Sequence, residues 1–234
     1  MGLVADVRAA YDIWADTYPS VAHNPLMRIE QEIVESILMT LRPSRALDVG
    51  TGSGRYLPVL ARAGAERVVG ADFSMPMLRR VAKPATGSDP VSDPVSDPFV
   101  VCADAQRLPF ARRAFDLVNA SLMVGDVEDL RAWTAEMARV LMRGGHLIYS
   151  DFHPSWTEHG WTRTFCDGRG ETHALEFAPH SIDDHLAALD AAGLQTRAIR
   201  EPRFHDDRDP AVREFQRRWR NPPVVAIFHA VKPL

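Results

Sequence analysis

The sequence predicts an α/β fold in which helices cover both faces of a mostly parallel sheet. Two observations predict it. Between residues 43 and 151, short apolar runs alternate with stretches of helical periodicity, the order expected of parallel strands joined by helical crossovers. One of those runs ends in glycines at positions 50, 52 and 54, directly before helix-compatible sequence. A strand, a tight turn and a helix N-terminus in that order are typical of sheets that bind nucleotide-like ligands.

Two helices are expected before this core. In residues 5–18 apolar side chains recur at helical spacing until Pro19 interrupts the pattern. A second helix is predicted over 25–41, with Ile29 and Ile33 on its apolar stripe. We therefore expect residues 1–42 to form an N-terminal helical cap.

The core elements are then predicted in order along the chain. Strands are expected at 45–49, 67–71, 99–102, 115–120 and 146–150, and helices at 54–63, 75–82, 129–142 and 181–192. Gly144 and Gly145 read as a turn that ends the third of these helices. Two further strands, at 194–203 and 223–231, fit an antiparallel C-terminal hairpin within residues 181–234. The result is a seven-stranded sheet in a single domain over 1–234.

Two segments interrupt the alternation. Residues 84–98 contain Ser-Asp-Pro three times, and prolines at that density can neither continue a helix nor donate ladder hydrogen bonds. We expect a disordered loop there. Residues 152–180 have no clear periodicity and follow a predicted strand at its carboxyl end, where insertions in such sheets commonly cover the ligand. We expect this segment to form a lid.

Composition and sequence patterns argue against several classes of protein. The net charge of −4 gives no indication of nucleic-acid binding. No apolar run approaches the roughly 18 residues that span a membrane, so we expect a soluble cytoplasmic protein without a membrane partner. Cys102 and Cys166 form no metal motif, and His180 and His185 lack the i,i+4 spacing of a helical zinc pair. We expect no metal, and the sequence carries no signal for oligomeric state.

The glycine cluster limits the ligand further. Its spacing is GxGxG, whereas the dinucleotide fingerprint GxGxxG would need glycine where Arg55 stands. The Gly-Lys-Ser/Thr ending of a P-loop is also absent from it. Asp48 lies two residues before the first of these glycines, and its carboxylate favours a ligand that carries an amino group.

Five motifs in order give the chain a family resemblance. They are Asp48-Val-Gly-Thr-Gly-Ser-Gly54, Val68-Val-Gly-Ala-Asp-Phe-Ser-Met-Pro-Met-Leu78, Asp104-Ala-Gln-Arg-Leu-Pro-Phe110, Phe115-Asp-Leu-Val-Asn-Ala-Ser121 and Glu136-Met-Ala-Arg-Val-Leu141 before Arg143-Gly-Gly145. Over residues 45–151 the chain resembles the class I S-adenosylmethionine-dependent methyltransferases, in particular the small-molecule branch called type 11. The resemblance implies a Rossmann-like fold, S-adenosylmethionine as cofactor and a small-molecule acceptor.

The resemblance also implies cofactor-binding residues. Asp72 would accept hydrogen bonds from the ribose hydroxyls, although a helix N-cap is the alternative. Asp104 would accept from the adenine amine, with the Ala105 N–H on a ring nitrogen; the alternative for Asp104 is a turn aspartate. Met77, beside Phe73, would pack on the adenine face, unless it belongs to the core.

A second set of residues is expected to contact the methionine moiety of the cofactor. Gly50, Thr51 and Gly52 would approach it, and Asp48 would engage its amine. Ser121 follows the strand on the other side. Residues 11–18 match the aromatic helix that precedes the core in many of these enzymes, and they make Tyr18 a candidate for the cofactor carboxylate, with core packing as its alternative.

Acceptor residues are expected outside the motifs. His153 follows the strand at 146–150 and is the candidate general base, because histidine exchanges protons near neutral pH. His23, Trp156 and Trp161 are candidates for acceptor contacts. Residues 197–220 hold many arginines, which form either a solvated face or a patch for an anionic acceptor.

Two other functions stay open at this point. One is a non-catalytic S-adenosylmethionine-binding module or a cyclase that borrows the fold. The other is a nicotinamide-dependent dehydrogenase, against which the glycine spacing and the Asp104-Ala105 pair argue.

Overall fold

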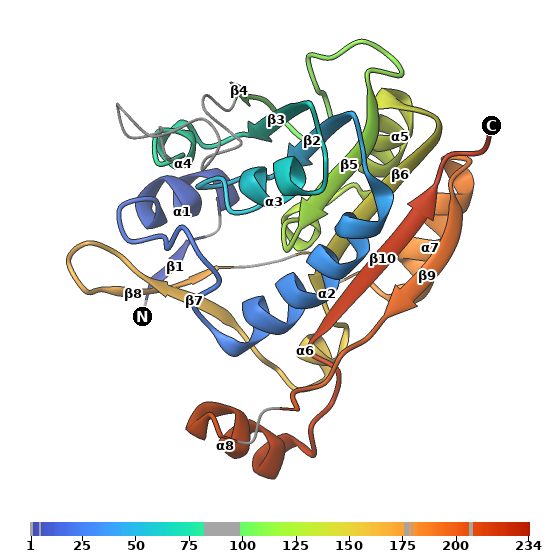
Figure 1. Cartoon of the computed structure of the whole chain (residues 1–234). Coiled ribbons are helices and arrows are strands. Elements are labelled where there is room, and N and C mark those ends of the chain that lie inside the picture. Colours follow the sequence, from blue (N-terminus) through green and yellow to red (C-terminus); the bar gives the residue numbers. More distant parts are fainter. Residues whose placement is uncertain (1, 5, 82–98, 176–177, 179, 206–207) are drawn as a thin grey trace.

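The computed structural model describes residues 2–4, 6–81, 99–175, 178, 180–205 and 208–234. Its main sheet has seven strands (Figure 1). In spatial order they are β4 (Phe99–Cys102), β3 (Arg67–Asp72), β2 (Arg45–Val49), β5 (Phe115–Ser121), β6 (Leu141–Phe152), β10 (Val225–Val231) and β9 (Gln195–Arg200). The first five are parallel, and β10 pairs antiparallel with both β6 and β9. The predicted fold class is confirmed.

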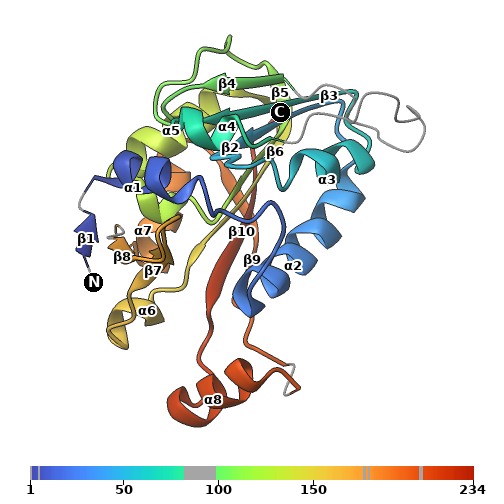
Figure 2. The ribbon, with the colours of Figure 1, turned by 90° about the vertical axis from the view of Figure 1, so that its left-hand side faces the viewer.

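Helices cover both faces of this sheet (Figure 2). On one face α5 (Leu130–Val140) and α7 (Ile182–Ala191) pack over one apolar cluster of strand residues. On the other, α2 (Pro25–Leu41) and α3 (Leu57–Arg62) pack over a second cluster. Since both faces are covered, the interior strand β2 is buried along four of its five residues. Its buried polar side chain, Asp48, lies near the carboxyl end, where the ligand is expected.

The N-terminal segment lies at the carboxyl ends of β2 and β3. Helix α1 (Val7–Trp14) ends before the predicted residue 18 and packs against α4 (Met75–Leu78), where Ser74 Oγ donates a hydrogen bond of 2.6 Å to Asp12. Helix α2 begins as predicted, with Asn24 as N-cap accepting from the Met27 N–H. Between these helices the chain passes over the glycine turn, where Ser53 Oγ donates to the Pro19 carbonyl.

Some predicted boundaries are wrong. The helix predicted over 129–142 ends at Val140, and β6 runs through Gly144 and Gly145, which were expected to form a turn. The reason is a register irregularity opposite Phe115–Leu117, which Gly144 accommodates with φ +76°. Helix α3 begins at Leu57 because residues 52–56 form turns. The helix predicted over 75–82 ends at Leu78, and residues 79 and 80 form a turn. The expected loop 84–98 lies outside the described residues.

The segment 152–180 and the arginine-rich stretch hold structure that periodicity did not reveal. The former contains α6 (Ser155–Glu158), β7 (Arg163–Cys166) and β8 (Thr172–Leu175), and β8 pairs with both β7 and β1 (Gly2–Val4) in a small second sheet. The latter contains α8 (Pro210–Trp219), which lies beyond α6 at the bottom of Figure 1. A single 3₁₀ turn, η1 (Val124–Asp126), follows β5. Searching the described part of the chain reveals no helix long and apolar enough to cross a membrane.

Candidate functional site

The glycine turn follows β2 directly. Gly50, Gly52 and Gly54 have φ of +67°, +56° and +87°, a region in which side chains with a Cβ are strained. Their surroundings differ. A Cβ on Gly50 would lie 2.7 Å from Met123 Cβ, whereas a Cβ on Gly52 would have nothing within 4 Å. Gly52 therefore faces open space at the end of the sheet.

Asp72, at the end of β3, is tied to this turn. Its Oδ2 accepts from the Gly52 N–H and its Oδ1 from the Ser74 N–H, both at 2.8 Å. The N-cap of α4 is Ser74, whose Oγ accepts from the Met77 N–H. Burial raises the pKa of Asp72, while the two N–H groups stabilise its ionised form. The carboxylate is thus fixed beside Gly52, and its capping alternative is filled by another residue.

Asp48 lies beneath the turn, almost fully buried. Thr51 Oγ1 donates to its Oδ2 at 2.7 Å, and Asn119 Nδ2 donates to its Oδ1 at 2.8 Å. Burial raises the pKa of Asp48 to about 6, although these two hydrogen bonds act in the opposite direction and lower it. Such a carboxylate gains stabilisation from a cation placed next to it.

The other predicted cofactor residues differ in how far they are buried. Asp104 is exposed and its Oδ1 accepts from the Gln106 N–H in a turn, with Ala105 half-buried beside it. Ser121 is half-buried and hydrogen-bonded to Asn119. Phe73 makes an edge-to-face contact with Tyr11. Met77 is fully buried, so contact with a ligand would require its side chain to move.

Glu30 of α2 was not singled out from the sequence. It is fully buried, and its Oε2 accepts from Arg55 Nη1 at 3.0 Å and from the Tyr56 hydroxyl at 2.9 Å. Its Oε1 accepts from Ser150 Oγ at 2.8 Å. The signal was its spacing, because Glu30 lies four residues before buried Val34 on the same helical face. This carboxylate joins the N-terminal cap to α3 and β6.

A cavity of about 740 Å³ lies between the N-terminal cap, the segment after β6 and α8. We call it the aromatic cavity, because Trp156, Trp161, Phe215 and Trp219 contribute to its wall. Tyr18, His23, Trp156 and Trp161 all line it, so the structure brings together residues that the sequence proposed separately for cofactor and acceptor. Leu122, which follows Ser121 at the end of β5, extends it toward the strand ends.

His153, the predicted base, is not among the residues that line this cavity. Its Nδ1 accepts from the Ser155 N–H at 3.1 Å, so the proton resides on Nε2, which donates to Glu201 Oε1 at 2.9 Å. Both ring nitrogens are therefore engaged, and His153 has no lone pair directed at an acceptor. The structure places it as a link between the end of β6 and the segment after β9.

Two residues that the sequence reasoning missed line the cavity as well. Arg163 of β7 donates to both carboxylate oxygens of Asp126 in η1, and Tyr11 donates to Asp126 Oδ2 at 2.7 Å. His159, which follows α6, donates from Nδ1 to the Ser155 carbonyl at 2.7 Å. Neither side chain belongs to a motif, and only the fold brings both to the cavity.

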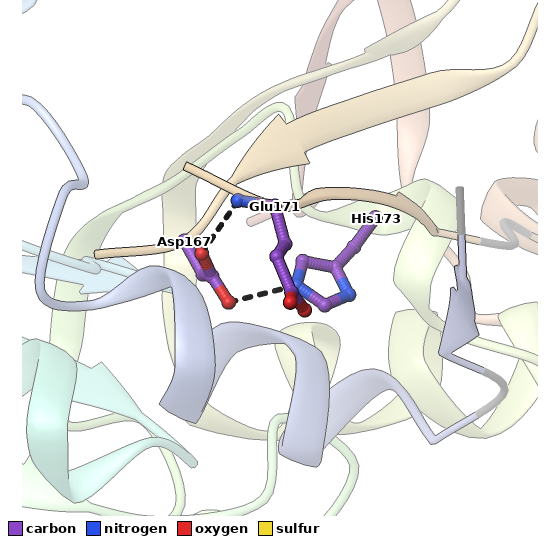
Figure 3. Close-up of side chains that lie close together, drawn as sticks. All are labelled: Asp167, Glu171 and His173. Atoms are coloured by element: carbon purple, nitrogen blue, oxygen red, sulfur yellow. Dashed lines mark hydrogen bonds and ion pairs between the residues drawn. The ribbon is translucent and has the colours of Figure 1, made fainter. Parts of the chain in front are cut away.

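A histidine–carboxylate cluster lies in the hairpin between β7 and β8 (Figure 3). Potential ligand atoms of Asp167, Glu171 and His173 lie within 4.8 Å of one another. The Asp167 carboxylate accepts from the backbone N–H groups of Arg169 and Glu171 and from His173 Nε2, and these contacts lower its pKa. Hydrogen bonding of a hairpin turn accounts for the cluster.

Comparison with known proteins agrees with this arrangement. Residues 47–149 match a family model described as a methyltransferase domain, the type 11 model. Over these residues the chain is similar to the type 11 branch of the class I S-adenosylmethionine-dependent methyltransferases. The family predicted from the five motifs is confirmed.

Relatives of this chain carry different names. The chain is 30% identical over 185 residues to a malonyl-[acyl-carrier protein] O-methyltransferase of Methylovorus sp., covering 78% of the chain and 62% of the relative. It is 33% identical over 147 residues to a demethylmenaquinone methyltransferase of Clavibacter sepedonicus, covering 63% and 55%. The chain thus spans about three fifths of the length of the curated relatives it matches.

A solved structure extends the likeness to the whole chain. The [4+2]-cyclase SpnF has a TM-score of 0.66 over 100% of both chains, at 18% sequence identity. At that identity the likeness concerns the fold alone. A methyltransferase fold with its N-terminal cap and C-terminal strands is therefore compatible with more than one chemistry.

Proposed function

We propose that this protein transfers a methyl group from S-adenosylmethionine to a small-molecule acceptor held in the aromatic cavity. The observation that carries the proposal is the carboxylate arrangement: Asp72 fixed beside the open space at Gly52, and Asp48 buried beneath it. A ligand with a ribose and a cationic amine satisfies both carboxylates. The proposal extends to the whole chain what its family suggests for residues 47–149.

The cofactor would be held by groups at the carboxyl ends of β2, β3 and β4. Asp72 accepts the ribose hydroxyls with the lone pairs that Gly52 and Ser74 leave open. Asp48 stabilises the amine, directly or through water. The remaining predicted contacts come from Tyr18, Gly50, Thr51, Phe73, Met77, Asp104, Ala105 and Ser121.

The bound cofactor supplies a methyl group on a positively charged sulfur, which a nucleophile displaces in line. The protein's part is to align the acceptor and to exclude water. Segment 152–180 is the proposed lid that excludes water, since residues of β7 and α6 line the aromatic cavity. Arg163, neutralised by Asp126, anchors this segment to the turn after β5.

The test has two stages. Calorimetric titration should detect S-adenosylmethionine and its demethylated product S-adenosylhomocysteine at one site, with no heat from nicotinamide adenine dinucleotide. Incubation with methyl-tritiated S-adenosylmethionine and a panel of aromatic hydroxyl, carboxylate and amine compounds should then label an acceptor. Binding without transfer to any of them favours the cyclase or binding-module alternative. Failure to bind S-adenosylmethionine and S-adenosylhomocysteine contradicts the proposal.

A further inference from the structure

We propose that the aromatic cavity binds a flat aromatic acceptor carrying an acidic hydroxyl group, and that His159 takes the proton of that hydroxyl. This inference rests on the proposed methyl transfer and adds the acceptor class and the base.

The walls of the cavity suit a planar ring. Trp161 contacts Trp156, Phe215 and Trp219 with ring centroids 5.3, 5.0 and 5.4 Å apart. The Trp156 indole is held by its Nε1 donating to the Val224 carbonyl at 3.0 Å. Faces and edges of fixed aromatic rings stabilise another ring by stacking and edge contacts. The cavity thus favours an aromatic acceptor over a flexible polar one.

The charges around the cavity discriminate between aromatic acceptors. Within the part of the chain that the structure describes, its charged lining residues are Arg163 and Arg218, and no aspartate or glutamate lines it. Asp126 neutralises Arg163, whereas the Arg218 guanidinium stacks over Trp219 at 4.8 Å. A cationic amine would find no carboxylate partner there and would meet Arg218. A neutral hydroxyl compound or an anion is favoured.

His159 has the geometry of a base toward this cavity. A carbonyl oxygen can only accept, so the 2.7 Å contact with the Ser155 carbonyl puts the proton on Nδ1. Nε2 then carries a lone pair. The ring is stacked on Trp161 at 4.8 Å and meets Trp219 edge-on at 5.1 Å, which fixes it within the aromatic wall. His153, by contrast, has both nitrogens engaged outside the cavity.

As the hydroxyl oxygen bonds to the methyl carbon, the carbon–sulfur bond breaks and its electron pair stays on sulfur, which leaves as a neutral thioether. The hydroxyl proton moves to His159 Nε2, producing an imidazolium that later loses the proton to water. An ether is formed. The base matters only when the hydroxyl is still protonated in the bound acceptor.

The first experiment measures binding to protein saturated with S-adenosylhomocysteine. Calorimetry compares 2-naphthol, 2-naphthoate and 2-naphthylmethylammonium. We expect the first two to bind and the ammonium compound to bind at least about tenfold more weakly. Trp161→Ala should weaken 2-naphthol about tenfold by removing a stacking surface. Phe99→Ala, an aromatic-to-alanine truncation at a 63% exposed residue of the distant strand β4, should leave binding unchanged. Equal or tighter binding of the ammonium compound overturns the acceptor class.

The second experiment separates a base from a structural residue. His159→Gln should slow methyl transfer to 2-naphthol about 100-fold, but transfer to a nitro-substituted naphthol, already ionised at the assay pH, only a few-fold. His205→Gln, at an exposed histidine outside the cavity lining, should change neither. An equal loss with both acceptors, or no loss with either, overturns the base assignment.

Failure of the underlying function gives a different result. Protein that does not bind S-adenosylhomocysteine refutes the proposed function, while the naphthyl compounds still test the cavity in the ligand-free protein. Protein that binds S-adenosylhomocysteine and both hydroxyl compounds but methylates neither refutes the hydroxyl acceptor while leaving cofactor binding intact.

Discussion

The strand-end site and the aromatic cavity are built in opposite ways. The strand-end site, comprising Asp48, residues 50–52, Asp72 and Asp104, comes from one continuous stretch of chain, and its contacts are backbone N–H groups and carboxylates. The aromatic cavity draws on segments from Tyr11 to Val224, and its contacts are ring faces and edges. In the proposed function the polar strand-end site holds the cofactor, and the aromatic cavity sets the acceptor.

The two sites meet through a few polar connections. Glu30 joins the N-terminal cap to α3 and β6, and Asp126 joins β7 to the turn after β5 and to Tyr11. Variants that break these connections, or that alter one site alone, test whether the division holds.

The largest effect is expected from Glu30→Ala. It leaves Arg55, Tyr56 and Ser150 without their shared acceptor in a buried position, so the free energy of unfolding should fall by about 3–5 kcal/mol. Denaturant unfolding measures this loss. Glu32→Ala, at an exposed glutamate of the same helix, is the control and should stay within about 0.5 kcal/mol of the parent. Similar values for both variants would show that Glu30 does not hold the cap.

Asp72→Ala tests the strand-end site itself. Two charge-assisted hydrogen bonds to the ribose are worth about 3 kcal/mol together, so affinity for S-adenosylhomocysteine should fall about 100-fold or more. Calorimetry measures it, with thermal unfolding to verify that the variant is folded. Asp190→Ala, at an exposed aspartate of α7, should bind as the parent does. Binding of 2-naphthol in the cavity should survive Asp72→Ala, and a parallel loss of both would contradict the independence of the two sites.

Gly50→Ala and Gly52→Ala form a matched pair. Both add a methyl group at positive φ, at a cost of about 1–2 kcal/mol in conformational strain. Only at Gly50 does the added Cβ meet Met123 at 2.7 Å, so this variant should lose more stability. The Gly52 variant should instead lose cofactor affinity in excess of its loss of stability, because its methyl group enters the open space. If the loss of cofactor affinity stood in the same proportion to the loss of stability in both variants, the cofactor would have to bind elsewhere.

The smallest effect concerns pH. With its pKa at about 6, Asp48 is mostly protonated at pH 5 in the ligand-free protein, and binding a cationic amine requires its ionised form. Affinity for S-adenosylhomocysteine should thus rise up to about tenfold from pH 5 to pH 7. Asp48→Asn should bind more weakly at pH 7 and have a shallower slope. Asp72 titrates in both proteins, so the difference between their slopes isolates Asp48. Identical slopes would exclude contact between Asp48 and the amine.

The contrast between the sites also explains what the sequence could predict. The positions of the sheet strands along the chain followed from periodicity, and Asp48, Gly52 and Asp72 followed from short motifs that lie at or next to the ends of β2 and β3. Gly144 misled the prediction, since a glycine pair inside a kinked strand looks like a turn.

The cavity could not be assembled from local patterns. Its wall depends on α8 meeting the segment after α6, which brings Trp219 to Trp161 across 57 intervening residues. The sequence does not distinguish His153 from His159, and only the structure shows that both ring nitrogens of His153 are engaged, whereas His159 lines the cavity and is bonded through Nδ1. Acceptor chemistry is therefore encoded in contacts between distant segments.

A crystal structure with S-adenosylhomocysteine tests the central claim most directly, namely that the cofactor lies at the strand ends with its reacting sulfur facing the aromatic cavity. We predict the ribose hydroxyls on Asp72, the amine beside Asp48, and the sulfur between Tyr18 and Leu122, open to the cavity. A sulfur directed away from the aromatic cavity, or a ligand bound without contact to Asp72, would contradict the account.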